Sequence, residues 1–175
     1  MSEMSTPAQP GEGSNLLYKL IEWICLAFAV IGGLIFILES VMTVISVLGR
    51  AVYNQPIQGD YEIVQMVSAM AIALCLPYCQ LRRGHVFVDF FTLWAPERLK
   101  KALDSLAALL LALVAFLLCW RVYHGYLDMV DYQETTMVLG LPIWWTYIPM
   151  IPAFFMLGVA ALVTCLSDLK ELFKS

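Results

Sequence analysis

The residues of this chain that could most readily do chemistry are two histidines, two closely spaced cysteines and one acid within an apolar run. His85 and His124 could each ligate a haem iron, as histidines do in many haem proteins. Cys75 and Cys79 are one helical turn apart, a spacing that could suit a metal ion or a disulfide. Glu39 lies inside a long apolar stretch, where an ionisable side chain is costly and is a functional candidate by default.

The surrounding sequence argues against most of these chemistries. The two histidines stand at opposite ends of apolar segments, about a membrane thickness apart, so they cannot clamp one haem. All five cysteines lie in apolar runs, as small buried hydrophobes do, and Cys75 and Cys79 have no second cysteine pair nearby. Phosphate-binding loops, nucleophile elbows and HExxH patterns are absent from the sequence. We therefore expect a protein that is not an enzyme and has no cofactor or metal site.

The composition indicates an integral membrane protein. Of the 175 residues, 61% are hydrophobic, and the mean hydropathy is +0.79, whereas soluble domains are about 45–50% apolar. No basic patch alternates with aromatic residues, so nucleic acid is not an expected partner.

The apolar segments predict an all-α membrane protein with four transmembrane helices. The clearest segment has no charged residue from Ile63 to Leu81, and acids precede it whereas Arg82 and Arg83 follow it. A disordered cytoplasmic tail is expected over residues 1–15 and a single four-helix domain over residues 16–175. The predicted spans are about 20–49, 61–81, 102–123 and 142–167. An amphipathic segment at residues 85–101, between the second and third spans, is predicted to lie on the membrane surface.

The distribution of basic residues predicts the orientation. Lysine and arginine accumulate on the cytoplasmic side of membrane proteins, and placing both termini in the cytoplasm puts only Arg50 and Arg121 outside. An acidic outer loop containing Asp128, Asp131 and Glu134 is then expected between the third and fourth spans. The basic residues on the inner side are Lys19, Arg82, Arg83, Arg98, Lys100, Lys101, Lys170 and Lys174.

The small and polar residues of the first span follow alternating steps of three and four, which places them on one face of a helix. This first-span seam is predicted to face protein, because small residues allow close approach of two helices. It consists of Glu22, Cys25, Ala29, Gly32, Phe36, Glu39, Thr43, Ser46 and Arg50. A similar face is expected on the second span, with Glu62, Gln65, Ala69, Ala73 and Gln80.

Three stretches together resemble a known family. The first is RAVYNQPIQGDYE at residues 50–62, the second is RRGHVFVD at 82–89, and the third is LGLPIWWTYIPMIP at 139–152. In order, and with four spans, they resemble the small membrane subunit of tripartite ATP-independent periplasmic (TRAP) transporters, the DctQ-like family. The resemblance runs from about Leu20 to Leu169.

The resemblance implies a multi-pass protein of the bacterial inner membrane that works in a heteromeric complex. Such a subunit would scaffold and anchor a large membrane subunit that carries the sodium and substrate sites. A periplasmic binding protein would deliver an organic acid, such as a C4-dicarboxylate or a sialic acid. Two other classes remain open, a stand-alone structural or regulatory tetraspan protein and a redox membrane enzyme.

The candidate site residues are then expected to be structural, or to contact the partner subunit or membrane lipids. They are Glu39, Arg50, Glu62, Arg82, Arg83, His85, Asp89 and Arg121. Arg50 and Glu62 are expected to pair with each other or with partner groups. Arg82 and Arg83 are expected to contact lipid phosphates or the partner. For Glu39, two alternatives stay open: an ion pair with Arg121, or donors on the large subunit.

Overall fold

A computed structural model describes residues 15–53, 57–82 and 97–174 of the chain. It contains four long helices, α1 (Asn15–Tyr53), α2 (Asp60–Leu81), α4 (Glu97–Tyr132) and α5 (Trp144–Lys174). All four are long and apolar enough to cross a membrane, over Tyr18–Val52, Asp60–Leu81, Leu103–Tyr132 and Trp144–Ser167. The predicted all-α fold with four candidate membrane helices is therefore confirmed. The cytoplasmic placement of the termini remains a prediction.

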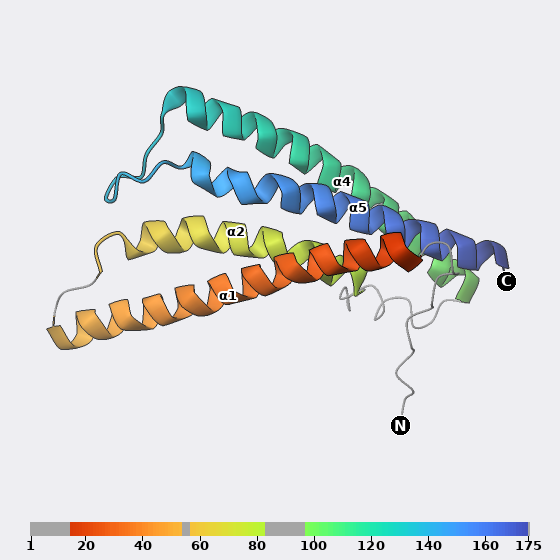
Figure 1. Ribbon diagram of the computed structural model, residues 1–175, viewed down its shortest axis with the longest axis horizontal. Helices are drawn as coiled ribbons and strands as arrows, with labels where there is room; N and C mark the ends of the chain where they lie inside the picture. The colour runs from red at the N-terminus through yellow and green to blue at the C-terminus, as the bar shows by residue number, and fades with distance from the viewer. Residues whose placement is uncertain (1–14, 54–56, 83–96, 175) are drawn as a thin grey trace.

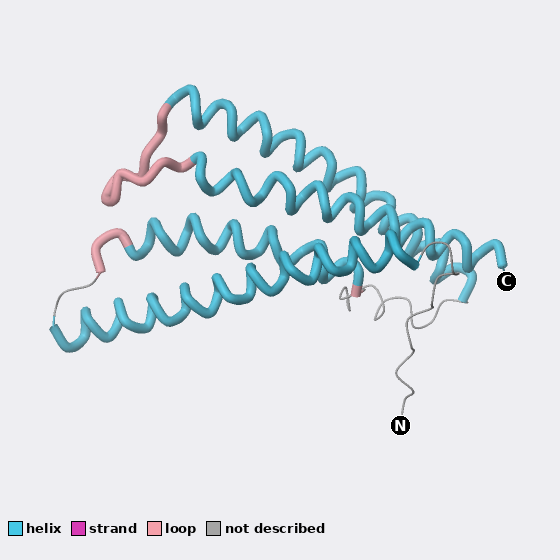
Figure 2. Tube along the Cα trace, in the orientation of Figure 1, coloured by secondary structure: helices cyan, strands magenta, loops and turns pink. Residues whose placement is uncertain are grey.

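The helices form two pairs joined through a central contact. α1 packs along α2, α4 packs along α5, and α2 and α5 lie against each other. α1 and α4 therefore lie on opposite sides of the α2–α5 pair, which Figure 1 shows as the order α4, α5, α2, α1. The two pairs spread apart at the end that carries the α1–α2 and α4–α5 connections and converge at the other end (Figure 2).

Small residues determine how closely the helices approach. Ala108, Ala112 and Ala115 of α4 are buried. On α5, a Cβ added to Gly158 would lie 2.9 Å from the Phe116 ring of α4. Around α2, buried Ala73 and Leu74 cluster with Ala153. These contacts use van der Waals packing between close backbones, the main source of helix association where lipid replaces water.

α1 and α4 extend furthest beyond their predicted spans. α1 begins at Asn15 and ends at Tyr53, and α4 runs from Glu97 to Tyr132 instead of residues 102–123. Asp128 and Asp131 therefore lie on the last turns of α4, and the prediction that they belong to a loop was wrong. At about 1.5 Å per residue, helices of 39 and 36 residues exceed a hydrocarbon layer of roughly 30 Å.

The predicted surface segment at residues 85–101 falls largely outside the described residues. Its last part, from Glu97, is the first turn of α4. The short connection between α4 and α5 is described and contains an isolated β-bridge between Thr135 and Pro142.

Candidate functional site

Most of the first-span seam faces α2, although Thr43 is exposed and donates to the Glu39 carbonyl of its own helix. Cys25, near the end of the helices that is predicted to be cytoplasmic (the inner end), is buried in a cluster with Leu81 of α2 and Ala160 of α5. One turn further on, the carbonyl of Ala29 accepts a hydrogen bond from the Cys75 thiol at 3.9 Å. A Cβ on Gly32 would lie 2.8 Å from Cys75 Sγ. The small residues of the seam thus bring the backbones of α1 and α2 together, and the polar residues find partners there.

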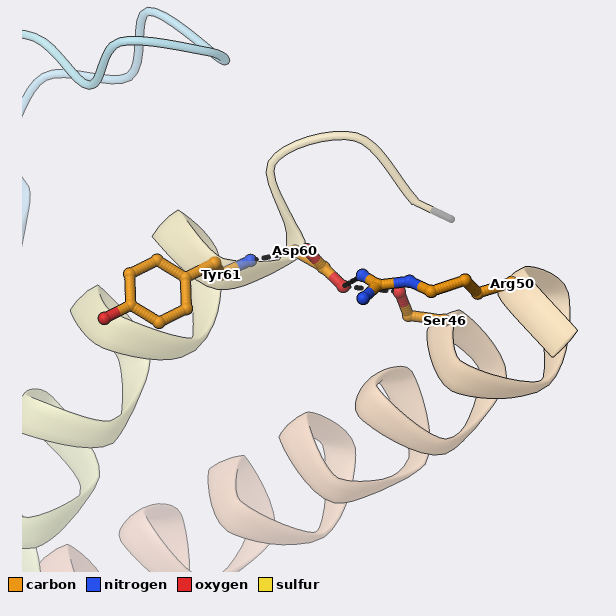
Figure 3. A network of polar contacts seen from close by, with 4 residues as sticks. All are labelled: Ser46, Arg50, Asp60 and Tyr61. Carbon is orange, nitrogen blue, oxygen red and sulfur yellow. Dashed lines mark hydrogen bonds and ion pairs between the residues drawn. The ribbon is translucent and has the colours of Figure 1, made fainter. Parts of the chain in front are cut away.

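A network of polar contacts closes the end of the α1–α2 pair that is predicted to be periplasmic (the outer end; Figure 3). The Ser46 hydroxyl donates to Asp60 Oδ2 at 2.5 Å, and the Arg50 guanidinium lies 3.7 Å from the same oxygen. The other carboxylate oxygen, Oδ1, accepts the backbone N–H of Tyr61 at 2.8 Å. Asp60 therefore holds the first turn of α2 against the last turns of α1. The sequence-based pairing of Arg50 with Glu62 does not form, because Asp60 occupies the position beside Arg50.

Glu62 contacts the α4–α5 connection instead. Its two carboxylate oxygens accept the backbone N–H groups of Val138 at 2.9 Å and Leu139 at 3.1 Å. The Thr136 hydroxyl and the Met137 amide also face this carboxylate. One side chain of α2 thereby satisfies several backbone donors of a loop more than seventy positions away in the chain. We call this contact between Glu62 and residues 136–139 the outer clasp.

Backbone geometry shapes the loop that Glu62 holds. The N–H of Thr136 donates to the Leu141 carbonyl at 2.9 Å, and the N–H of Gly140 donates to the Thr136 carbonyl at 3.1 Å. Gly140 has a φ of 64°, which favours glycine at this turn. Gly59, just before α2, has a φ of 77° and lies under Leu139, so a Cβ there would be 2.7 Å from Leu139 Cδ1. The outer clasp thus joins two of the three stretches that resemble the family in sequence, residues 50–62 and 139–152.

Glu39 has a partner within the chain. The Ser68 hydroxyl of α2 donates to Glu39 Oε1 at 2.6 Å. The second oxygen, Oε2, is buried without a hydrogen-bond partner. Neither sequence-based alternative named Ser68. No ion pair joins Glu39 to Arg121 in the described part of the chain, because the two residues lie on the two outermost helices.

The inner end of the α1–α2 pair carries a second ion pair. Arg82, directly after α2, lies 3.0 Å from Glu22 Oε1 of α1. Its Nε donates to the Tyr78 hydroxyl at 3.1 Å, and its guanidinium carbon lies 5.4 Å from the centre of the Tyr78 ring. The hydrogen bond with Tyr78, more than the nearby Glu22, raises the pKa of Arg82. Arg82, which was predicted to contact lipid or a partner subunit, thus binds Glu22 and Tyr78 of this chain.

The remaining candidate residues are placed as follows. Arg121 is exposed on α4 and has no ion pair among the described residues. His124 is exposed one turn later, with its ring centre 5.0 Å from that of Trp120. Arg83, His85 and Asp89 lie outside the described residues. No three metal-ligating side chains gather within the described ranges.

Several contacts were not anticipated from the sequence. Ser68 and Asp60 were not singled out as partners of the first-span seam, and the bond between Gln80 and Thr164 at 3.1 Å, which links α2 to α5, was also missed. One sequence pattern could have indicated Ser68. It is followed by Ala71 and Cys75 at steps of three and four residues, which places all three on one face of α2.

Comparison with known proteins places the chain in a family. Residues 39–171 match the family model described as tripartite ATP-independent periplasmic transporters, DctQ component. The ectoine TRAP transporter small permease protein TeaB of Halomonas elongata is 26% identical over 165 residues, which cover 94% of this chain and 82% of TeaB. The sialic acid TRAP transporter permease protein SiaT of Haemophilus influenzae is 27% identical over 99 residues, 57% of this chain and 15% of SiaT.

This chain therefore matches only a small part of SiaT but most of TeaB. No solved structure matches the chain. The family is one of transporter subunits rather than enzymes. Because the family model covers most of the sequence and agrees with the four membrane helices, the chain belongs to the DctQ family of TRAP small permease subunits, which are multi-pass proteins of the bacterial inner membrane.

Proposed function

We propose that this chain is the scaffold subunit of a TRAP transporter, which binds a large permease subunit and enlarges its stationary part. The open arrangement of the helices is the observation that carries this proposal. α1 and α4 each contact the rest of the chain along one side. Their other sides expose large apolar residues, among them Ile37, Val41, Leu113 and Leu117. Those faces need lipid or another membrane protein to cover them.

The polar groups inside the membrane support the same role. Glu39, Ser46 and Gln80 all bond to neighbouring helices of this chain. These side chains therefore join helices to one another. A solute could bind to them only if it broke those hydrogen bonds. A subunit built in this way stabilises a complex, whereas the solute and ion sites belong to the larger partner.

The proposed transporter takes up a carboxylate-bearing organic solute, driven by sodium and delivered by a periplasmic binding protein. The relatives point to this class, because TeaB is named for ectoine and SiaT for sialic acid, and both solutes carry a carboxylate. A C4-dicarboxylate belongs to the same class.

Reconstitution tests the scaffold role. The partner permease is identified by co-purification with the tagged chain from native membranes, and proteoliposomes are then prepared with this chain, the large permease, or both. Uptake of radiolabelled succinate or sialic acid is measured with the binding protein and an inward sodium gradient. We expect uptake only when both subunits are present. Uptake by this chain alone, or full uptake by the large permease without it, would contradict the proposal.

The alternative is a stand-alone tetraspan protein, and the same experiment separates the two. A chain that purifies from native membranes without a large permease, and that is folded and stable alone, would favour the alternative.

A further inference from the structure

α4 is an edge helix with one packed side and one open side. Its packed side carries Ser105, Ala108, Ala112 and Ala115, which are buried. The opposite side carries exposed residues at steps of three and four, which place them in one stripe along the helix. We call this the open stripe of α4, and it consists of Leu106, Leu110, Leu113, Leu117, Arg121, His124 and Asp128.

Arg121, which the sequence-based charge count placed outside, lies within the candidate membrane span of α4, Leu103–Tyr132. Two residues before it, the Cys119 thiol donates to the carbonyl of Ile151 at 3.5 Å. Four residues after it, a Cβ on Gly125 would lie 3.1 Å from the Tyr147 ring. Arg121 is therefore level with residues 147–151 of α5, about five residues or roughly 8 Å inward of Trp144. Trp144 and Trp145 mark the outer interface, as aromatic belts do.

No counter-charge for Arg121 is present in the described chain. The next acid outward on the open stripe, Asp128, is seven residues away, or roughly 10 Å along the helix. Glu39 lies on α1, beyond the α2–α5 pair, and bonds to Ser68. Leu117 and Trp120, which both precede Arg121 on α4, are 57% and 61% exposed, so the side of Arg121 toward the middle of the helix is apolar, while the exposed His124 follows one turn later. An unpaired cation at this depth is costly and marks a functional position.

The direction of α4 makes it hard for Arg121 to reach water by itself. Side chains on a helix lean toward its N-terminus, and the N-terminus of α4 lies at the end of the molecule opposite to Trp144 (Figure 1). The Arg121 side chain thus starts out directed away from the outer surface. To reach water at the outer surface, the Arg121 side chain would have to turn back on itself. A carboxylate at the same depth on a neighbouring helix would neutralise the Arg121 charge without such a turn, because a guanidinium binds a carboxylate through two parallel hydrogen bonds.

We propose that the open stripe of α4 is the docking surface for a transmembrane helix of the large permease, and that this helix presents a carboxylate to Arg121. The leucines from Leu106 to Leu117 form the apolar part of the contact, and Arg121 sets its depth and register. This inference rests on the proposed function, because it names the part of the chain that the large permease covers.

The test uses the co-expressed complex with a photo-crosslinking amino acid at position 117, because Leu117 is an exposed member of the open stripe one turn from Arg121 and its replacement leaves Arg121 in place. A cross-link to the large permease, identified by mass spectrometry, is expected at position 117. Position 112, where Ala112 is buried against α5, serves as the matched control and should yield no link to the permease. Cross-linking of position 117 to lipid alone, or to no partner, would overturn the inference.

Substitutions give a second readout. Arg121→Glu should weaken co-purification of the large permease by about tenfold or more, since a buried charge pair is lost and a like charge replaces it. Arg121→Lys should weaken it less, because the charge remains while the bidentate geometry is lost. Unchanged co-purification of Arg121→Glu would overturn the docking surface and leave the scaffold role intact. Failure of the unaltered chain to bind any large permease would instead contradict the proposed function.

Discussion

At the scale of single residues, Glu62 holds α2 to the connection between α4 and α5. Its carboxylate accepts the N–H groups of Val138 and Leu139, and bonds to a charged acceptor are stronger than bonds between neutral groups. Glu62→Ala should release the outer clasp. We expect the amides of Val138 and Leu139 to exchange with deuterium faster, on the order of tenfold, in the variant.

Gln65→Ala is the matched control, because Gln65 is an exposed residue one turn further along α2. Its exchange pattern at residues 138–139 should equal that of the unaltered protein. Equal protection of these amides in Glu62→Ala would mean that the loop is held by its own backbone bonds and not by the clasp.

Ser68 is the single donor to Glu39 in the described chain. Removing its hydroxyl leaves both oxygens of a partly buried carboxyl without partners. Ser68→Ala should therefore lower the free energy of unfolding by about 1–3 kcal/mol, measured by thermal denaturation in detergent.

Ser40→Ala provides the comparison for that variant. The Ser40 hydroxyl is exposed and bonds to the Phe36 carbonyl of its own helix, so its loss should change the free energy of unfolding by less than about 0.5 kcal/mol. Adding Glu39→Leu to Ser68→Ala should recover part of the lost stability, because the unpaired carboxyl is then gone. A double variant less stable than Ser68→Ala would contradict this account of the Glu39–Ser68 contact.

At the scale of elements, two neighbouring glycines of α1 allow a direct test of the α1–α2 packing. A Cβ on Gly32 would lie 2.8 Å from Cys75 Sγ and 2.9 Å from the Ala71 carbonyl, whereas a Cβ on Gly33 meets nothing within 4 Å. Gly32→Ala should destabilise the protein by about 1–3 kcal/mol through overpacking.

Gly33→Ala, by contrast, should stabilise it by up to about 1 kcal/mol, since alanine favours the helix and finds open space. Thermal denaturation of the two variants in the same detergent gives the comparison. The packing described for α1 would be wrong if Gly33→Ala were the more damaging change.

The face of α1 was predictable because spacing on a helix is fixed. Glu22, Cys25, Gly32 and Glu39 were predicted to face protein, and each of them contacts α2 or the residue that follows it. The partners were harder to predict, because a spacing rule says which face is polar but not which helix covers it.

Distances along the chain explain the contacts that the sequence did not reveal. Asp60 and Glu62 are two residues apart and similar in chemistry, so their roles depend on where the neighbouring loops lie. The loop at residues 136–140 folds back through Gly140, in a left-handed conformation, and places its N–H groups at Glu62. That arrangement is tertiary and has no local signature. The helix ends were also misplaced, since hydropathy measures the apolar part of a helix and α4 continues through Asp128 and Asp131.

At the scale of the whole molecule, two helix pairs share one central contact. α2 and α5 meet through Ala73, Leu74 and Ala153 and through the bond between Gln80 and Thr164. The outer clasp gives the same two pairs a second connection at the end where they spread apart (Figure 2). The chain is thus tied together at both ends while the faces of α1 and α4 stay open, as a subunit that joins a larger complex requires.

The orientation in the membrane is the last prediction. Ion pairs mark both ends of the α1–α2 pair, Arg50 with Asp60 at one and Arg82 with Glu22 at the other. Because basic residues predominate around Arg82 and acids around Asp128 and Asp131, the positive-inside rule places the Asp131 end in the periplasm and both termini in the cytoplasm. Single cysteines at positions 131 and 19, in a cysteine-free background, report this with a membrane-impermeant thiol reagent added to intact spheroplasts. Position 131 should react and position 19 should react only after the membrane is opened; the reverse pattern would invert the topology.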